Sequence, residues 1–250
     1  MFSVGTGRVG AVPARESKFV RESALARRAP GKPDIVLSVS TPLDSIKVVY
    51  ASPRCVVIDK PPGVLSVPGK GEHNRACVAT WAQARFPRAT GPITVHRLDM
   101  DTSGLLVVAL DPEAQRELSR QFEAREVEKE YTAVAEGMVA CDRGVIDAPL
   151  RPDPTNRPMQ VIDREFGRPA RTRYEVRAFE FGHTRLTLVP ETGRTHQLRV
   201  HCALIGHPIL GDVLYGDAAA AERMLLHASR LCFTDPERGQ RVEVHCPAPF

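Results

Sequence analysis

The stretch HRLDMDTSGLLVVAL, residues 96–110, joins a loop dense in polar and charged side chains to a run of apolar ones. The run from Gly104 to Leu110 is short and almost wholly apolar, which predicts a buried strand. Asp111, Pro112 and Glu113 then supply a helix N-cap, a proline at the first helical position and an acid in the first turn. The charged loop is therefore expected at the edge of a rigid core, where catalytic side chains are usually held.

Short predicted strands and helices precede and follow this stretch. Alternating or apolar runs predict strands at 48–50, 55–58, 131–135, 172–178, 184–188, 225–233 and 241–246. Helical spacing predicts helices over 74–85, over 111–122 and over 195–205, the last stopped by Gly206 before Pro208. Helices mixed irregularly among strands favour an α+β fold, with mainly antiparallel pairing, over a repeating βαβ fold.

The composition is typical of a soluble globular protein. Of its 250 residues 42% are hydrophobic, but no apolar run approaches the roughly 20 residues that span a bilayer, and no secretory signal begins the sequence. We therefore expect a cytoplasmic protein. The six cysteines form no C-x-x-C pair, which favours reduced thiols over a zinc ribbon or a disulfide framework.

Charge divides the chain into two parts. Residues 1–33 hold seven basic and two acidic side chains, which leaves the rest of the chain near −1 although the total is +4. We expect residues 1–46 to form a basic, flexible extension and residues 47–250 to form the catalytic domain. The extension could also add nonspecific affinity for RNA, or be an Arg-rich organellar presequence.

The loop before Gly104 has two interpretations when its residues are taken alone. Asp99 or Thr102 could cap backbone amides in a solvated turn, which is the commoner use of such residues. Alternatively, the dense polar set could carry chemistry. Asp99 and Asp101 are two residues apart in one loop, which does not give the opposed carboxylates of a glycoside hydrolase.

Several motifs decide between these interpretations. The pattern H-R-L-D-x-x-T-S-G resembles the signature of the RluA-type pseudouridine synthases, with Asp99 at the position of the family aspartate. Further motifs follow in the order of that family: KPPG (60–63), KEY (129–131), GRTHQLRVH (193–201), GHPILGD (206–212), YG (215–216) and LHA (226–228). The resemblance covers residues 47–250. It implies the pseudouridine synthase fold, with a catalytic cleft, and isomerisation of uridine to pseudouridine in RNA.

The resemblance assigns three catalytic residues. Conversion of uridine breaks a C–N glycosidic bond and makes a C–C bond to the same base, so a carboxylate must attack the nucleoside or stabilise its developing charge. Asp99 is this carboxylate by resemblance, Tyr131 the residue that stacks on the base, and Arg199 the arginine that pairs with the aspartate. Tyr131 as a sheet-core residue and Arg199 as a surface helix charge are the alternatives.

The same resemblance extends to substrate contacts. The target base must leave the RNA stack, which needs a wedge to fill the gap and a pocket to receive the base. Arg97 is the expected wedge, Leu198 lines the pocket, and His96 and Thr102 of the loop motif are expected to contact substrate. His196 has a simpler interpretation, as a capping or hydrogen-bonded core histidine.

No cofactor is expected. Water is not a reactant, so no metal is needed to activate it, and the five-residue spacing of His196 and His201 differs from the four-residue spacing of a zinc pair. We predict neither a metal nor an organic cofactor.

The region from 151 to 177 is expected to contact RNA. It holds seven arginines and four acids, which could form a surface that binds RNA phosphates. Arg157 and Arg168 are the residues expected to contact the RNA. An exposed, salt-bridged hairpin is the alternative. The segments 151–158 and 167–172 resemble the short branch of the family, which lacks an S4-like domain and acts on a tRNA anticodon stem-loop and a large-subunit rRNA hairpin.

Two rival functions stay open. The chain could be an inactive RNA-binding protein of the same fold, or a different enzyme such as a nucleoside hydrolase or a metal-dependent nuclease. Intact Asp99, Tyr131 and Arg199 argue against the first rival. Structured RNA is the expected partner, and a monomer without an obligate protein partner is the expected state.

Overall fold

The computed structural model describes residues 42–69 and 76–250. The predicted basic extension lies outside the described residues as far as residue 41. The described chain begins with a short 3-10 helix, Pro42–Ser45, and Ile46 directly after it is buried in the core. No helix in the described segments has both the length and the apolar character needed to cross a bilayer.

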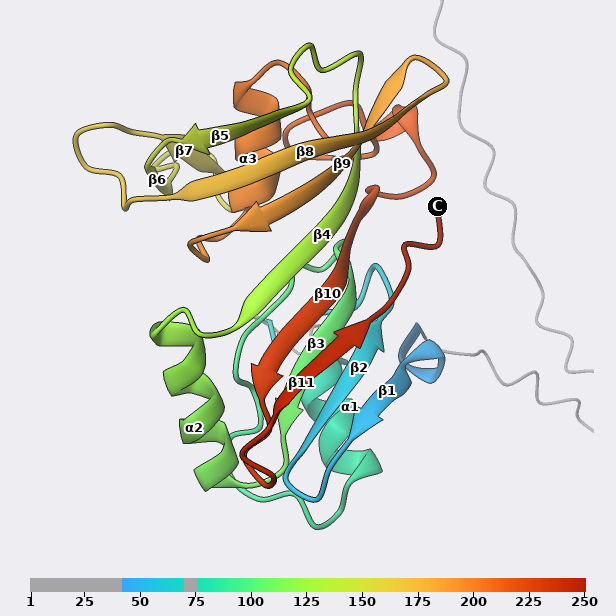
Figure 1. Ribbon diagram of the computed structural model, residues 1–250, viewed down its shortest axis with the longest axis vertical. Helices are drawn as coiled ribbons and strands as arrows, with labels where there is room; N and C mark the ends of the chain where they lie inside the picture. Colours follow the sequence, from blue (N-terminus) through green and yellow to red (C-terminus); the bar gives the residue numbers. More distant parts are fainter. Residues whose placement is uncertain (1–41, 70–75) are drawn as a thin grey trace, which may run out of the picture. The chain divides into compact units, whose positions relative to one another are not determined.

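A nine-stranded sheet forms the centre of the fold (Figure 1). Eight of its strands follow in the order β1 (Lys47–Ala51), β2 (Cys55–Lys60), β3 (Ser103–Ala109), β10 (Leu226–Thr234), β4 (Glu128–Ala135), β9 (His183–Pro190), β8 (Arg171–Glu180) and β5 (Arg143–Asp147), and β11 (Arg241–His245) pairs with β10. Only β3 and β10 are parallel; every other pairing in this sheet is antiparallel. The predicted α+β class with a mixed, mostly antiparallel sheet is confirmed.

Three helices lie against this sheet. They are α1 (Val78–Arg85), α2 (Pro112–Glu123) and α3 (Gln197–Leu204), and a 3-10 turn covers Ala218–Ala220. The predicted N-cap of α2 is confirmed, because the Asp111 carboxylate accepts hydrogen bonds from the backbone amides of Glu113 and Ala114. Helix α2 packs on β3 and β10, whereas α3 contacts β7 and β9.

Three strands between residues 143 and 162 were not predicted. They are β5, β6 (Leu150–Pro152) and β7 (Gln160–Ile162), the last two forming a separate hairpin. Each is at most five residues long, too short for a clear alternation of apolar and polar positions. Two helices also begin later than predicted, α1 at Val78 and α3 at Gln197.

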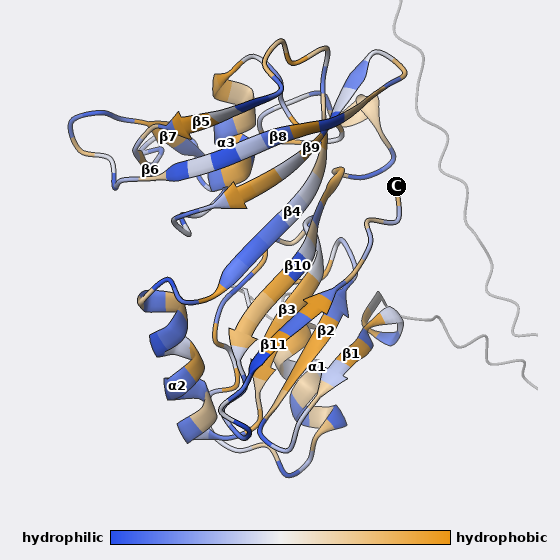
Figure 2. Ribbon diagram, viewed as in Figure 1, coloured by the Kyte–Doolittle hydropathy of each residue, from blue (hydrophilic) through white to orange (hydrophobic). Residues whose placement is uncertain are grey.

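The sheet is buried in two hydrophobic clusters that meet at β4. One surrounds β2 and β3, whose residues are mostly apolar (Figure 2), and every residue of β3 is buried. The other joins β4 and β9 to α3. Tyr131 of β4 packs against both clusters. This residue therefore lies where the two cores adjoin.

Candidate active site

A cleft of about 1480 Å³ opens beside β4. The loop before β3, the start of β4, the strands β8 and β9 and the loop that leads into α3 all contribute to its walls. Seven of the residues predicted for the site line it: His96, Arg97, Leu198, Asp99, Thr102, Tyr131 and Arg199. Residues far apart in the sequence therefore meet here as the motifs predicted.

Asp99 sits on a loop that neighbouring segments hold in place. The Ser66 hydroxyl donates to the Leu98 carbonyl at 2.7 Å and accepts from the Leu98 amide at 3.0 Å. On the other side of Asp99, the Met100 carbonyl accepts from the Lys60 ammonium and from the Gly63 amide, both at 2.9 Å. The carboxylate itself stays 24% exposed, so its backbone is held while its side chain faces the cleft.

Lys60 explains why a KPPG segment accompanies the loop of Asp99. Its ammonium is fully buried and donates to the carbonyls of Pro61, Val64 and Met100 at 2.8–2.9 Å. Burial lowers the pKa of Lys60 to about 7, against the attraction of Asp101 and Asp99. The side chain thus connects the turn after β2 to the loop of Asp99.

Gly104 explains why the loop motif and the LHA motif belong together. β3 and β10 pair in parallel through Ser103 with His227 and Gly104 with Ala228. A Cβ atom at Gly104, whose φ is +105°, would lie 2.4 Å from the Ala228 carbonyl oxygen. Only glycine permits this approach of the two strands, which sets the end of the Asp99 loop against the core.

Arg199 is shared between two carboxylates. Its Nε and Nη2 donate to Asp212 at 2.7 and 2.6 Å, and Nη1 lies 3.6 Å from Oδ2 of Asp99. The side chains of Arg199 and Asp212 are 3% and 0% exposed. Burial opposes the charge of Arg199, but the hydrogen bonds and attraction of Asp212, with that of Asp99, raise its pKa.

This arrangement leaves Asp99 available for chemistry. The bidentate pair with Asp212 fixes the guanidinium plane, and the Tyr215 ring lies 5.2 Å from its centre. The longer contact to Asp99 supplies positive charge without a second short hydrogen bond. Asp212 belongs to the GHPILGD motif, but sequence reasoning assigned it no role, because nothing local in the sequence identifies its partner.

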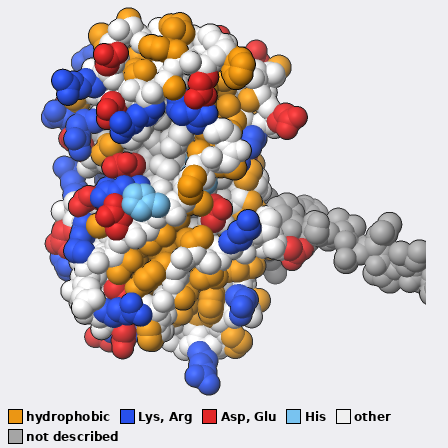
Figure 3. All heavy atoms as spheres, turned by 45° about the vertical axis from the view of Figure 1, so that its right-hand side comes forward, with side chains coloured by type: hydrophobic (Ala, Val, Ile, Leu, Met, Phe, Trp, Pro, Cys, Tyr) orange, Lys and Arg blue, Asp and Glu red, His pale blue; other side chains and the backbone are white. Residues whose placement is uncertain are grey.

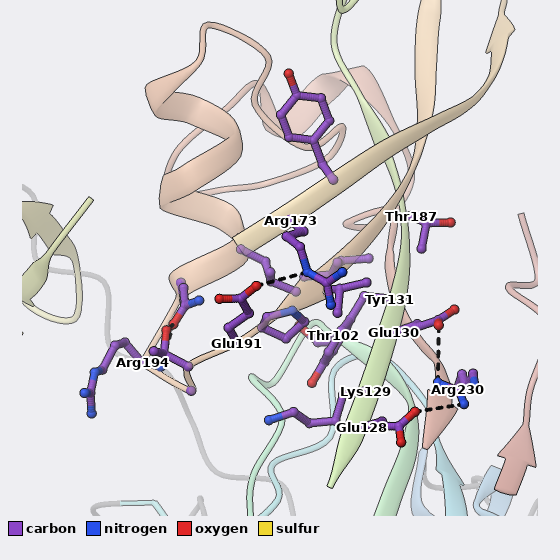
Figure 4. Close-up of a pocket in the computed structure, with 18 of the residues that line it drawn as sticks. Thr102, Glu128, Lys129, Glu130, Tyr131, Arg173, Thr187, Glu191, Arg194 and Arg230 are labelled. Atoms are coloured by element: carbon purple, nitrogen blue, oxygen red, sulfur yellow. Dashed lines mark hydrogen bonds and ion pairs between the residues drawn. The ribbon is translucent and has the colours of Figure 1, made fainter. Parts of the chain in front are cut away.

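Tyr131 projects from β4 into the pocket, as Figure 4 shows, on the same side of the strand as Lys129. Glu128 and Glu130 alternate with them and reach Arg230 at 3.1 and 3.3 Å. Burial, and then the charge of Asp99, raise the pKa of the Tyr131 hydroxyl. At neutral pH this side chain is a phenol, suited to stacking rather than to accepting a proton.

The other loop residues hold different positions. Arg97 is exposed and donates to the Thr195 hydroxyl at 3.0 Å, which connects the two sides of the cleft. His96 accepts from the Val107 amide at 3.1 Å and stacks on Phe122 at 4.3 Å. Burial, with repulsion from Lys129, lowers the pKa of His96 to about 3, so the ring is neutral.

The remaining predicted residues divide into two groups. Thr102 and Leu198 are 3% and 8% exposed and line the cleft. Arg157 and Arg168 are exposed, and neither lines the cleft: Arg157 lies in the turn between β6 and β7, and the Arg168 amide donates to Leu150.

One group in the described chain has the donor types of a metal site. Side-chain atoms of Asp59, His227 and Cys246 lie within 4.8 Å of one another. However, both nitrogens of His227 are within hydrogen-bonding distance of protein oxygens, at Ser103 and the Cys246 carbonyl. Burial, then Asp59, raise the pKa of the Cys246 thiol to about 11, so the group is a closed hydrogen-bonded cluster with a protonated thiol.

Comparison with known proteins agrees with this geometry. Residues 54–204 match the RNA pseudouridylate synthase family. The chain therefore belongs to this family of RNA-modifying isomerases, and the predicted resemblance is confirmed.

Individual relatives cover most of the chain. It is 48% identical to the dual-specificity RNA pseudouridine synthase RluA of Yersinia pestis over 81% of this chain and 99% of that one. The corresponding protein of Escherichia coli K12 is 45% identical, over 81% and 93%. Among solved structures, human RNA pseudouridylate synthase domain containing 1 superposes with a TM-score of 0.70 at 32% identity, over 84% and 86% of the two chains.

Proposed function

We propose that this pseudouridine synthase acts on a uridine that has been turned out of a structured RNA into the cleft, with Asp99 as its reactive carboxylate. One observation carries the proposal: a partly exposed carboxylate lies at the cleft wall, 3.6 Å from a buried arginine that a second carboxylate already holds. The longer contact leaves the carboxylate free to meet the nucleoside, with a fixed positive charge beside it.

The reaction needs few participants. The bond from ribose C1′ to N1 of uracil breaks, the base turns, a bond from C1′ to C5 forms, and as C5 loses its proton N1 takes one up, so that the product is an isomer of the substrate. Asp99 either attacks C1′ or abstracts a ribose proton to give a glycal-like intermediate; both routes use the same carboxylate. Because no water is consumed, the cleft has no need of a metal-bound hydroxide.

Base turning requires a wedge and a receiving face. Arg97 is exposed at the cleft and Tyr131 projects into it, so we propose that Arg97 fills the gap in the RNA and Tyr131 stacks on the turned base. Thr102 and Leu198 complete the pocket wall. His96 supports the loop through Val107 and Phe122, so its contribution to substrate binding is indirect.

Four cations, which we name the rim cations, are proposed to bind RNA phosphates: Arg125, Lys129, Arg168 and Arg194. Three of them line the cleft, and Arg168 adjoins Arg194, whose Nε donates to the Pro169 carbonyl at 3.0 Å. Within the described chain, none of the four forms an ion pair with a carboxylate. Partial burial, then repulsion by Arg168 and Arg125, lower the pKa of Arg194, as expected where like charges gather.

Arg157 lies away from the cleft and is proposed as a more distant RNA contact. Basic side chains also gather along one edge of the face in Figure 3, with acidic ones among them. If charge reversal at Arg157 and Arg168 left RNA affinity and its salt dependence unchanged, this part of the proposal would be wrong.

The proposed substrates are a tRNA anticodon stem-loop and a large-subunit rRNA hairpin. Relatives named as dual-specificity enzymes, matched over most of both chains, support two substrates rather than one. We further propose that the protein acts in the cytoplasm as a monomer, which sedimentation at increasing concentration would test.

Pseudouridine formation in both transcripts, with EDTA present, tests the proposal. The intact protein should modify a defined uridine, whereas Asp99→Asn should fold normally and show no turnover. RNA binding without modification by the intact protein would favour the inactive RNA-binding alternative. Release of free uracil, or activity that EDTA abolishes, would favour a hydrolase or a metal-dependent nuclease.

A further inference from the structure

His196 stands at the cleft in an unusual backbone conformation. It is the N-cap of α3, with φ of 54° and ψ of 16°, the left-handed region that side chains other than glycine and asparagine rarely enter. Strained residues of this kind concentrate at functional sites, where surrounding contacts hold them. The contacts that hold His196 identify which of its ring nitrogens faces the cleft.

A hydrogen-bonded chain favours one tautomer of His196. The Gln160 backbone amide donates to the Tyr215 hydroxyl at 2.7 Å, and this hydroxyl lies 2.8 Å from Nδ1 of His196. Since an amide can only donate, the hydroxyl oxygen accepts from Gln160, and we assign the hydroxyl's own proton to the bond with Nδ1. With this assignment Nδ1 is the acceptor, and the proton of the neutral ring resides on Nε2.

The Nε2–H group has no partner in the described chain. No hydrogen bond joins it to a described residue, and it is not among the buried polar atoms left without one. His196 lines the cleft, so this donor is open to it. Asp99, Arg199, Asp212 and Arg97 are the charged groups that face the ring, and burial lowers its pKa, which keeps it neutral.

We propose that His196 contacts the substrate: its Nε2–H donates a hydrogen bond to an acceptor oxygen of the uridine nucleotide in the cleft, while Tyr215 and Gln160 act as positioning residues. This inference rests on the proposed function. A neutral donor suits a place beside Asp99, because it binds an acceptor oxygen of the nucleotide without competing with Arg199 for the carboxylate. A uracil carbonyl, the ribose 2′-hydroxyl and a phosphate oxygen share this chemistry.

Two substitutions separate this role from a structural one. In His196→Asn, the shorter amide can still meet Tyr215 and tolerates the left-handed conformation, but it cannot replace Nε2. In His196→Gln, the terminal amide can reach the position of Nε2. We expect both variants to fold, the Asn variant to lose about 10-fold or more in turnover, and the Gln variant to stay within a few-fold of wild type. Equal turnover of the Asn variant and wild type would overturn the proposal.

Modified substrates identify the contacted oxygen. Transcripts carrying 2′-deoxyuridine, a thio-substituted uracil or a phosphorothioate at the target are compared in the wild type and in His196→Asn. The difference between the two proteins should disappear with the one substrate that lacks the contacted oxygen. A difference of the same size with all of them would show that His196 acts only on the protein, against the proposal.

Nitrogen-15 NMR of His196 gives a readout that needs no turnover. The free protein should show the Nε2–H tautomer, and Tyr215→Phe should mix the two tautomers. Binding of the hairpin should shift the Nε2 resonance in the wild type and in Asp99→Asn alike. If the wild type is active but shows no such shift, the role of His196 is refuted and the proposed function stands. If the shift appears but the wild type shows no turnover, the role of His196 in binding is supported and the proposed function is refuted.

Discussion

The cation in the wall of the cleft and the cations at its rim differ in their pairing with carboxylates. In the wall, Arg199 is buried, bound by two short hydrogen bonds to Asp212 and aligned with Asp99. At the rim, Arg125, Lys129, Arg168 and Arg194 have no carboxylate partner among the described residues. Buried, paired charges fix geometry, whereas cations at the rim that lack a carboxylate partner attract phosphate over a distance and are screened by salt.

A third set of arginines supplies the matched control. Arg173 lies 3.0 Å from Glu191, a pair drawn in Figure 4, and Arg177 lies 3.0 Å from Glu175. Both line the same cleft as Arg125 and Arg194. Residue type and cleft are therefore shared with these two rim cations, whereas the carboxylate partner is not.

Among changes to the partners of these cations, Asp212→Asn is expected to have the largest effect. The amide can still accept from the backbone amides of Leu214 and Tyr215, but Arg199 loses its paired charge and is drawn toward Asp99. Loss of one member of a buried ion pair should lower the free energy of unfolding by about 3 kcal/mol. We also expect turnover to fall about 100-fold. Urea denaturation measures the loss of stability, and single-turnover kinetics measure the loss of turnover. A stable, fully active variant would show that Arg199 needs no second carboxylate.

His96→Gln tests the neutral, buried character of the cleft wall. The pKa of His96 is about 3 in the folded protein and about 6.5 when unfolded, so the unfolded state binds an extra proton between these values. Stability therefore falls as the pH drops from 6.5 toward 3, by about 2 kcal/mol at pH 5. Denaturation at pH 7.5 and at pH 5 measures the free energy of unfolding of both proteins. Between these pH values the variant should lose less of this free energy than the wild type, by about 2 kcal/mol. Equal losses in the two proteins would mean that His96 titrates normally.

Neutralising the rim should give the smallest effect per residue, confined to binding. Arg125→Gln and Arg194→Gln should each reduce the slope of log affinity against log salt by about 1, with turnover at saturating RNA unchanged. Arg177→Gln removes the same charge but leaves Glu175 without its partner, so its slope should change less. Fluorescence titrations at several salt concentrations measure this. Equal slopes for all three variants would remove the distinction between paired and unpaired arginines.

Local sequence patterns were enough to predict the helices and strands whose stability depends mainly on neighbouring residues. The apolar run after Gly104 is β3, and Asp111 caps α2 as predicted, because burial of a continuous apolar strand and capping by a neighbouring carboxylate depend on adjacent residues. The motif order also located Asp99, Tyr131 and Arg199 in one cleft. Strands β5, β6 and β7 escaped prediction because their stability comes from strands and loops elsewhere in the chain.

By itself, then, the sequence determined the family, the α+β fold and the residues that meet at the site. The tertiary structure alone decided which partner each of them has. It pairs Arg199 with Asp212, gives the rim cations no carboxylate partner among the described residues, and places His196 in a left-handed turn with Nε2 toward the cleft. Charge, tautomer and orientation depend on contacts between residues distant in the chain, and those contacts exist only after the core has packed.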